Sequence, residues 1–348
     1  MNVRTVYHRL VPRSNPELLS VVIPFYNEED VLPLIRSAFA GLPEMPRVQI
    51  EFILVNDGST DNTLEQLLAW ADADPRVTVV GLARNFGHQA ALTAGLDLAA
   101  GDAVITMDAD LQDPPEVIPE MLAEYRRGYD VVYARRTARH GEGAFKRFCA
   151  WLFYRLMRWL VHRDLPADCG DFRLVSRRCL DALKTMREEH RFLRGMVAWV
   201  GFAQTTVPFE RHPRAAGETK YPLHKLIRLA WTAAISFSPA PLRLSLGFGM
   251  GLALVGFADG AYAVARYLLG YSNPWGWTSL MVVVCLVGAA ILISIGILGE
   301  YIGRIFEQMK GRPLYIVSLT AGALRRQPTR IPPMLLEVPA ASIDGRAI

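Results

Sequence analysis

The stretch "VITMDADLQDPP", Val104–Pro115, joins an apolar run to a cluster of carboxylates and then to two prolines. The apolar start is typical of a buried strand, and the prolines end that strand because proline has no N–H to donate to a sheet. Asp108 and Asp110 therefore lie at the mouth of the predicted strand. An Asp-x-Asp pair alone is common in solvated loops, so the rest of the sequence must show whether this pair has a function.

The first half of the chain repeats this pattern of a short apolar run followed by a helical segment. The strand-like runs are "LLSVVIPFY", "IEFILVN", "VTVVGLA", "AVITMDA" and "YDVVYARR", at residues 18–26, 50–56, 77–83, 103–109 and 129–136. Segments with helical spacing lie at residues 27–42, 64–73 and 88–101. Strands that alternate with helices predict an α/β fold with a mostly parallel sheet.

Polar clusters follow the predicted strands. They are "YNEE" at residues 26–29, "NDGSTD" at 56–61, "RNFG" at 84–87 and "DADLQD" at 108–113. Parallel sheets bind ligands beyond the carboxyl ends of their strands, so we expect one site at this edge. Asp57 is placed to accept hydrogen bonds from a base or ribose, and Gly58 lets a ligand approach the backbone, although such a pair is often only a turn.

Asp108, Asp110 and Gln112 offer alternating oxygen ligands with no His or Cys among them. Oxygen-only ligands suit Mg²⁺ or Mn²⁺, which proteins commonly share with substrate phosphates. The sequence therefore predicts a divalent ion that neutralises a nucleotide diphosphate as it leaves.

The second half of the chain contains two long apolar segments. Hydrophobic residues make up 51% of the 348 residues, and they concentrate after residue 240. Thr278–Gly299 carries no charge, and Leu244–Ala265 carries only Asp259. Each is long enough to cross a bilayer core of roughly 30 Å. A buried core helix is the alternative, but the turn "SNPWGW" between the segments places Trp275 and Trp277 where a membrane interface would suit them.

The distribution of Lys and Arg predicts the topology of these spans. Residues 1–20 lack the apolar core of a signal peptide. Basic residues flank the outer ends of the spans, whereas Arg266 alone lies near the connecting turn; the flanking residues are Lys225, Arg228, Arg243, Arg304, Lys310 and Arg312. The positive-inside rule then places the soluble part and both termini in the cytoplasm.

Some classes of protein are disfavoured. The formal charge of +4 is too small to indicate nucleic-acid binding. The cysteines show no metal-site spacing and are expected to be reduced; they are Cys149, Cys169, Cys179 and Cys285.

The four polar clusters in this order resemble glycosyltransferase family 2, whose catalytic domain has the GT-A fold. "DADLQDPP" and "GDFRL", followed by two C-terminal spans, narrow the resemblance to the polyisoprenyl-phosphate glycosyltransferases. These include the dolichyl-phosphate mannose synthases and the bactoprenol glucosyltransferases. The stretch Gly299–Val317 is similar to the bacterial branch, and the resemblance covers roughly residues 18–318.

The resemblance implies roles for individual residues. Those implied to bind the nucleotide sugar are Pro24, Tyr26, Glu28, Asp57 and Asp108. The implied metal ligands are Asp108, Asp110 and Gln112, with Asp110 essential to catalysis. Asp168 and Asp171 flank the "GDF" motif, and one of them is implied to lie near the reaction centre. Asp168 is favoured for this role, and the alternative for Asp171 is a local pair with Arg173.

For the acceptor phosphate, the resemblance implies Arg135 and Arg147, although either could be an ordinary surface residue. Some relatives carry a hydroxyl residue shortly after the second arginine, and Ala150 stands there in this chain. Further basic residues are therefore expected to contribute: Lys146, Arg211 and Lys220.

The expected domains are an N-terminal extension (1–17), a GT-A domain (18–220), membrane-interface helices (221–242), two transmembrane helices (243–304) and a C-terminal segment (305–348). From Thr320 onward this last segment is rich in Pro and Ala, and we expect it to be poorly ordered.

The function implied is an inverting transfer of a hexose, glucose from UDP-glucose, to undecaprenyl phosphate at the bacterial inner membrane. GDP-mannose or a UDP-amino sugar is the alternative donor, and a homo-oligomer is expected. A nucleotidyltransferase would show a Gly-rich loop in place of "PFYNEE", and a processive synthase would need more spans and a Gln-x-x-Arg-Trp motif. A catalytically dead membrane scaffold is a further alternative, against which the intact metal residues argue.

Overall fold

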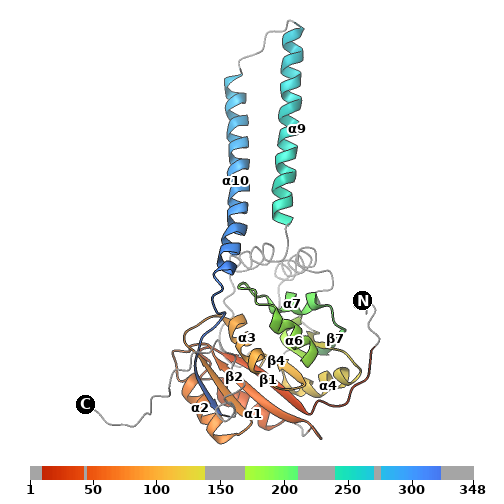
Figure 1. The fold of residues 1–348 in the computed structure, drawn as a ribbon, viewed down its shortest axis with the longest axis vertical. Coiled ribbons are helices and arrows are strands. Elements are labelled where there is room, and N and C mark those ends of the chain that lie inside the picture. Colours follow the sequence, from red (N-terminus) through yellow and green to blue (C-terminus); the bar gives the residue numbers. More distant parts are fainter. Residues whose placement is uncertain (1–9, 43–44, 138–168, 211–239, 270–275, 323–348) are drawn as a thin grey trace, which may run out of the picture. The chain divides into compact units, whose positions relative to one another are not determined.

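The computed structural model describes residues 10–42, 45–137, 169–210, 240–269 and 276–322 (Figure 1). These residues form two compact units, the central sheet with its helices in one and two long helices in the other. Within the described residues the sheet has eight strands in the order β7-β5-β6-β4-β1-β2-β3-β8. The bounds are β1 Leu18–Phe25, β2 Gln49–Asn56, β3 Val77–Leu82, β4 Ala103–Thr106, β5 Val131–Arg136, β6 Cys169–Ser176, β7 Gln204–Phe209 and β8 Val317–Gly322.

The strand directions bring the predicted polar clusters to one edge. β1 is parallel to β2 and β4, and β2 is parallel to β3. β6 is antiparallel to both β4 and β5, so β5 runs in the direction of β4. The carboxyl ends of β1 to β5 and the amino end of β6 therefore lie at the same edge. The predicted α/β fold with a mostly parallel sheet is confirmed, with β6 and β8 as its antiparallel strands.

Helices cover both faces of the sheet because side chains of a strand alternate between its two faces. Leu19, Val21 and Ile23 of β1 join the core beneath one set of helices, whereas Val22 joins the core on the other face. The first set is α1 Leu32–Ala40, α2 Thr63–Ala73 and, after the short 3₁₀ turn Pro115–Val117, α4 Ile118–Arg126. The second set is α3 His88–Leu98, α6 Arg177–Thr185 and α7 Leu193–Val200.

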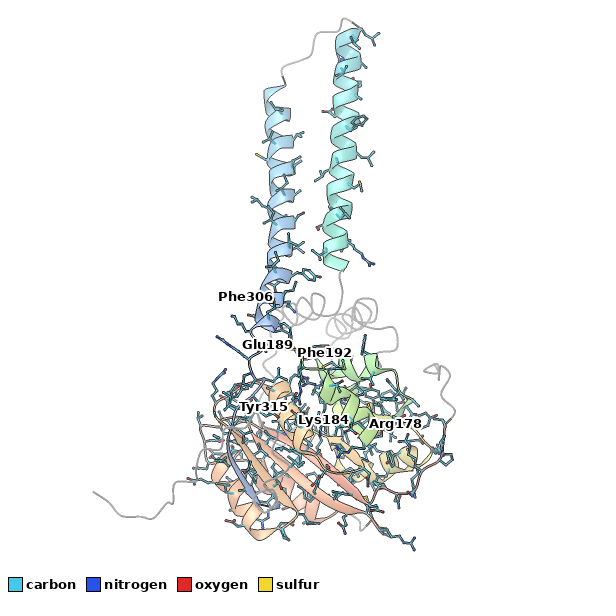
Figure 2. The ribbon with its side chains drawn as sticks, in the orientation of Figure 1. Arg178, Lys184, Glu189, Phe192, Phe306 and Tyr315 are labelled. Atoms are coloured by element: carbon cyan, nitrogen blue, oxygen red, sulfur yellow. The ribbon has the colours of Figure 1, made fainter. Side chains whose placement is uncertain are left out.

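Strand β8 extends the sheet beyond β3, with which it pairs in antiparallel register. Ser318 Oγ donates a hydrogen bond to the carbonyl of Gly81 at 3.0 Å. Tyr315, just before the strand and labelled in Figure 2, donates from its hydroxyl to Asp97 at 2.7 Å. The expectation of poor order from Thr320 onward is therefore wrong for the last three residues of β8. Its sequence, "VSLTAG", has a weak apolar pattern, and backbone pairing to β3 holds it.

The second unit contains α9 Ala240–Leu268 and α10 Trp277–Met309, which run side by side (Figure 1). Each is long and apolar enough to cross a membrane: the candidate spans are Leu242–Arg266 and Val282–Met309, and an 18-residue window within each has a mean hydropathy of 1.5 and 2.8, respectively. Their apolar windows are 0% buried, which disfavours the alternative of a buried core helix in a soluble protein. Asp259 is exposed within α9. The expected interface helices fall mostly on residues 221–239, outside the described part of the chain.

Candidate active site

The loops after β1 and β2 are joined by side-chain to backbone hydrogen bonds. Asn27, which has a left-handed φ of 53°, accepts from the N–H of Thr60 at 2.9 Å. Thr63 Oγ1 accepts from the N–H of Glu28 at 2.9 Å. These bonds hold the segment that carries Tyr26, whose side chain is 46% exposed beside the buried end of β1. The residues after β1 that are predicted to bind the nucleotide sugar therefore lie on a backbone that these hydrogen bonds hold in place.

Asp57 joins the loop after β2 to the loop after β3. Its two carboxylate oxygens accept from the N–H groups of Phe86 at 2.8 Å and Gly87 at 2.9 Å. Burial raises the pKa of Asp57, although these two hydrogen bonds oppose the rise. At Gly58, with φ of 66°, a Cβ would lie 2.5 Å from the carbonyl carbon of Arg84. Glycine is required there by the close approach of the two loops, a reason that sequence reasoning had not identified.

The loop after β4 carries the predicted metal ligands. Leu111 has a left-handed φ of 54°, and the turn lets Asp110 Oδ1 accept from the N–H of Gln112 at 3.2 Å. Non-glycine residues with positive φ cluster at functional sites, since the surrounding structure must hold them there. Asp108 Oδ1 and Gln112 Oε1 are buried and have no hydrogen-bond partner among the described residues. Buried oxygens without a donor fit a cation, so this loop can hold Mg²⁺ or Mn²⁺.

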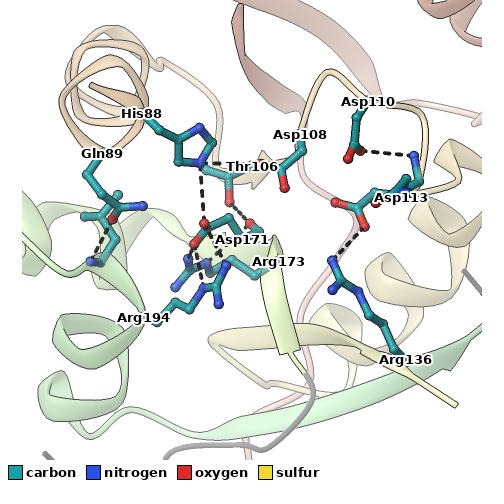
Figure 3. A network of polar contacts seen from close by, with 12 residues as sticks. His88, Gln89, Thr106, Asp108, Asp110, Asp113, Arg136, Asp171, Arg173 and Arg194 are labelled. Carbon is teal, nitrogen blue, oxygen red and sulfur yellow. Dashed lines mark hydrogen bonds and ion pairs between the residues drawn. The ribbon is translucent and has the colours of Figure 1, made fainter. Parts of the chain in front are cut away.

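Asp171 and His88 lie next to this loop (Figure 3). His88 Nε2 is 3.4 Å from Asp108 Oδ1 and 3.4 Å from Asp171 Oδ2. Asp171 is 3% exposed and forms ion pairs with Arg173 and with Arg194. Burial would raise the pKa of Asp171, but Arg194, His88 and Arg173 outweigh it and hold the pKa well below its usual range. The alternative of a local pair between Asp171 and Arg173 is thus confirmed, with Arg194 as a second partner.

His88, Asp108 and Asp171 also place three ligand atoms within 4.8 Å of one another. A metal ion there would meet the positive charge of the two guanidiniums that already neutralise Asp171. The ligand set of Asp108, Asp110 and Gln112 suits a divalent ion better, because the buried oxygens of Asp108 and Gln112 have no hydrogen-bond partner among the described residues.

Asp113, in the same loop after β4, forms a second ion pair with the partly exposed Arg136 (Figure 3). Asp113 is 1% exposed, and neither of its oxygens has a hydrogen-bond partner among the described residues. Arg136 Nη2 lies 3.8 Å from Asp113 Oδ1. Burial, and next the charge of Asp108, raise the pKa of Asp113 to about 7.

The remaining sequence-predicted residues are placed as follows. Pro24 is in β1, and Arg135 is exposed at the end of β5, next to Arg136. The predicted roles of Asp168, Lys146, Arg147, Arg211 and Lys220 fall outside the described residues. Sequence reasoning gave no role to four residues that the fold adds to the site: His88, Asp113, Arg136 and Arg194. Two of them had a signal, since Asp113 is part of the "DADLQD" cluster and His88 follows the "RNFG" cluster directly.

Comparisons with known proteins agree with this architecture. Residues 20–184 match the family model "Glycosyl transferase family 2", and residues 240–305 match "GtrB C-terminal hairpin". An uncharacterized glycosyltransferase of Bacillus subtilis is 44% identical over 303 residues, which cover 87% of this chain and 94% of that relative. A bactoprenol glucosyl transferase of Shigella phage SfII is 40% identical over 300 residues, 86% of this chain and 97% of the relative.

Among solved structures, the glucosyl-3-phosphoglycerate synthase of Mycobacterium tuberculosis aligns with a TM-score of 0.47 and 18% identity, over 63% of this chain and 76% of that one. Its likeness is remote compared with that of the sequence relatives. Because the chain covers nearly the whole length of relatives that are 44% and 40% identical, and carries the two family segments in order, it is a glycosyltransferase with a GT-A-type domain and belongs to glycosyltransferase family 2.

Proposed function

We propose that this glycosyltransferase transfers a hexose from a nucleotide sugar, UDP-glucose, to undecaprenyl phosphate with inversion at the anomeric carbon. The observation that carries the proposal is the composition of the site: Asp108 and Gln112 have buried oxygens without a hydrogen-bond partner among the described residues, and Arg136, Arg173 and Arg194 lie near Asp108 (Figure 3). The relatives named bactoprenol glucosyl transferase, at 40% identity, support the choice of sugar and lipid.

The acceptor phosphate needs little help from a general base. A phosphate monoester has a second pKa of about 6, so the lipid phosphate is mostly dianionic at neutral pH. One of its oxygens attacks the anomeric carbon while the bond from that carbon to the diphosphate breaks. No proton has to move in this step, and the protein's task is to position two anions and manage their charge.

The residues divide this task between them. Asp57 and the loops after β1 and β3 form the expected donor side, and Asp108, Asp110 and Gln112 would hold Mg²⁺ or Mn²⁺. When bound, this ion supplies positive charge to the departing diphosphate. Arg136, with its Nε buried and without a hydrogen bond among the described residues, adds a guanidinium at the same edge. Asp171 is poorly suited to accept a proton because its arginine partners stabilise its charged form.

The location proposed is the cytoplasmic face of the bacterial inner membrane, with α9 and α10 as the spans. β8 supports this topology because the chain leaves α10 at Met309 and pairs with β3 from Val317 onward. The sheet contains strands from before α9 and one strand from after α10, and two spans would return the chain to the side of the membrane on which it began.

The test is an assay of the purified full-length protein in detergent with undecaprenyl phosphate, Mg²⁺ or Mn²⁺, and separate UDP-glucose, GDP-mannose and UDP-amino sugars. We expect a lipid-linked hexose from UDP-glucose, detected by mass spectrometry, and none in excess EDTA. Transfer from another donor would correct the sugar, and no lipid-linked product from any donor would refute the proposal.

A further inference from the structure

We propose that Arg194 binds a substrate phosphate in this site and that Asp171 is the positioning residue that holds it there. This deepens the proposed function and rests on it for the identity of the substrates. Arg194 lies in the first turn of α7, far along the chain from the metal loop, and no motif of the sequence pointed to it.

The contacts of Asp171 leave little room for any other role. Its Oδ1 accepts from Arg173 Nη2 and from Arg194 Nε, the latter at 3.2 Å. Its Oδ2 accepts from Arg194 Nη2 at 3.0 Å and lies 3.4 Å from His88 Nε2. A carboxylate offers about four lone-pair sites, and these four contacts match them. To take a proton from a substrate, Asp171 would first have to give up one of these contacts.

The two arginines on Asp171 differ in what they present to a ligand. The Arg173 side chain, in β6, is 3% exposed, so it neutralises Asp171 inside the protein and is not accessible to a ligand. The Arg194 side chain is 37% exposed. Asp171 takes two hydrogen bonds from a guanidinium that carries five N–H donors, and it fixes the plane of that guanidinium from behind. The result is a pre-oriented cation at the surface of the site.

The position of Arg194 fits a phosphate that approaches the metal loop. A single imidazole, His88, contacts both Asp171 and Asp108, so Arg194 lies one side chain away from an expected metal ligand. In Figure 3, Arg194 and Arg136 lie on opposite sides of Asp108. Two guanidiniums near this loop are the arrangement expected for a reaction in which a diphosphate leaves and a phosphate arrives. Either of these anions supplies the phosphate that Arg194 would bind.

Binding measurements on the full-length protein separate the two sources without depending on turnover. Calorimetry would use UDP with Mn²⁺ for the donor and farnesyl phosphate, a short polyprenyl phosphate, for the acceptor. We expect Arg194→Gln to weaken the affinity for one of these two ligands by about 10- to 100-fold, because the substitution removes one charge-assisted hydrogen bond. Arg194→Lys should recover part of it. If UDP is affected, uridine, which lacks phosphate, should bind as before.

Arg187→Gln is the matched control. Arg187 also holds an aspartate, Asp97, through two hydrogen bonds and is 47% exposed, but Asp97 lies toward the other end of α3 from His88. Its substitution should leave both affinities unchanged.

The role of Asp171 is tested by combining variants. If Asp171 acts through Arg194, then Asp171→Asn weakens the affinity for the same ligand. The double variant with Arg194→Gln should then bind that ligand no more weakly than the weaker-binding single variant. If Asp171 were a general base, Asp171→Asn would instead lower kcat without changing ligand affinity, and its effect on the rate would multiply with that of Arg194→Gln. Unchanged affinity for both UDP and farnesyl phosphate in folded Arg194→Gln would overturn the inference. Wild-type protein that binds both ligands but transfers no sugar would refute the proposed function alone.

Discussion

Asp113 shows how a single residue can make stability depend on pH. In the folded protein burial raises its pKa to about 7, whereas the pKa in an unfolded chain is near the ordinary value of 3.8. Between these two values the folded state holds a proton that the unfolded state has released, so stability falls as pH rises from about 4 to about 7. Each unit of difference corresponds to about 1.4 kcal/mol, which makes the total on the order of a few kcal/mol.

We therefore predict that Asp113→Asn removes part of this fall. Melting temperatures of wild type and variant, measured in EDTA from pH 5 to pH 8, should diverge in favour of the variant as pH rises. The exposed Asp72→Asn variant is the control and should follow the wild type. Parallel curves for Asp113→Asn and wild type would show that Asp113 is not the group responsible.

Two neighbouring arginines on β5 test the acceptor side. Arg136 points toward Asp113, and Arg135 is exposed beside it. Lysine cannot reproduce the parallel hydrogen bonds of a guanidinium to phosphate. We predict that Arg135→Lys and Arg136→Lys each raise the concentration of polyprenyl phosphate needed for half-maximal rate, by about tenfold, while UDP binding with Mn²⁺ hardly changes. If only Arg136→Lys has this effect, the role predicted for Arg135 is wrong; if UDP binding collapses, both belong to the donor side.

At the scale of elements, the sheet includes a strand, β8, that follows α9 and α10 in sequence. A Cβ added to Gly81 of β3 would lie 2.7 Å from Cγ of Leu319 in β8. Gly81 thus makes room for the side chain that covers it, and a larger residue at position 81 would push β8 away from β3.

Gly81→Val should therefore destabilise the protein by about 1–3 kcal/mol, as overpacking does. Leu319→Ala, which empties the same space, should lower the stability only slightly on its own. Combined with Gly81→Val, it should restore much of the lost stability. Thermal unfolding of the four proteins measures the coupling, and strictly additive losses would mean that β8 does not pack on Gly81 in solution.

At the scale of the whole molecule, the predicted membrane topology can be tested with reporter fusions, whose positions must leave β8 intact. Reporters at the N-terminus and after Ile348 should both indicate a cytoplasmic location. A reporter inserted at Ser272, between α9 and α10 in the sequence, should indicate the periplasm. A fusion directly after Val317 would remove the rest of β8 and is avoided. A periplasmic reading at either terminus would contradict the proposed topology.

Asp259 is an exposed carboxylate within a predicted span. Such groups are costly in hydrocarbon and usually face protein, so we predict that Asp259 serves assembly with α10 or with a second copy of the chain. Asp259→Asn should keep turnover per folded molecule and weaken any oligomer, measured by light scattering in detergent. A large loss of turnover with assembly unchanged would show a role in the reaction instead.

The sequence was sufficient for the features that depend on local pattern. Apolar runs that alternate with helical segments predicted the sheet. Polar clusters at the ends of those runs were predicted to meet at one edge, and the directions of β1 to β5 confirm that they do. Long apolar segments predicted α9 and α10. These features follow from periodicity and hydropathy, which act between residues close together in the chain.

The tertiary structure alone decided which distant residues meet. Arg194 and Asp171 are 23 positions apart, and His88 reaches Asp171 from a different helix. Antiparallel β6 lacks an uninterrupted apolar run because it carries Asp171 and Arg173, and the apolar residues of β8 are interrupted by Ser318 and Thr320. Charges on such strands are stable only because the folded chain supplies their partners, and a partner contributed from elsewhere in the chain leaves no periodic trace in the sequence.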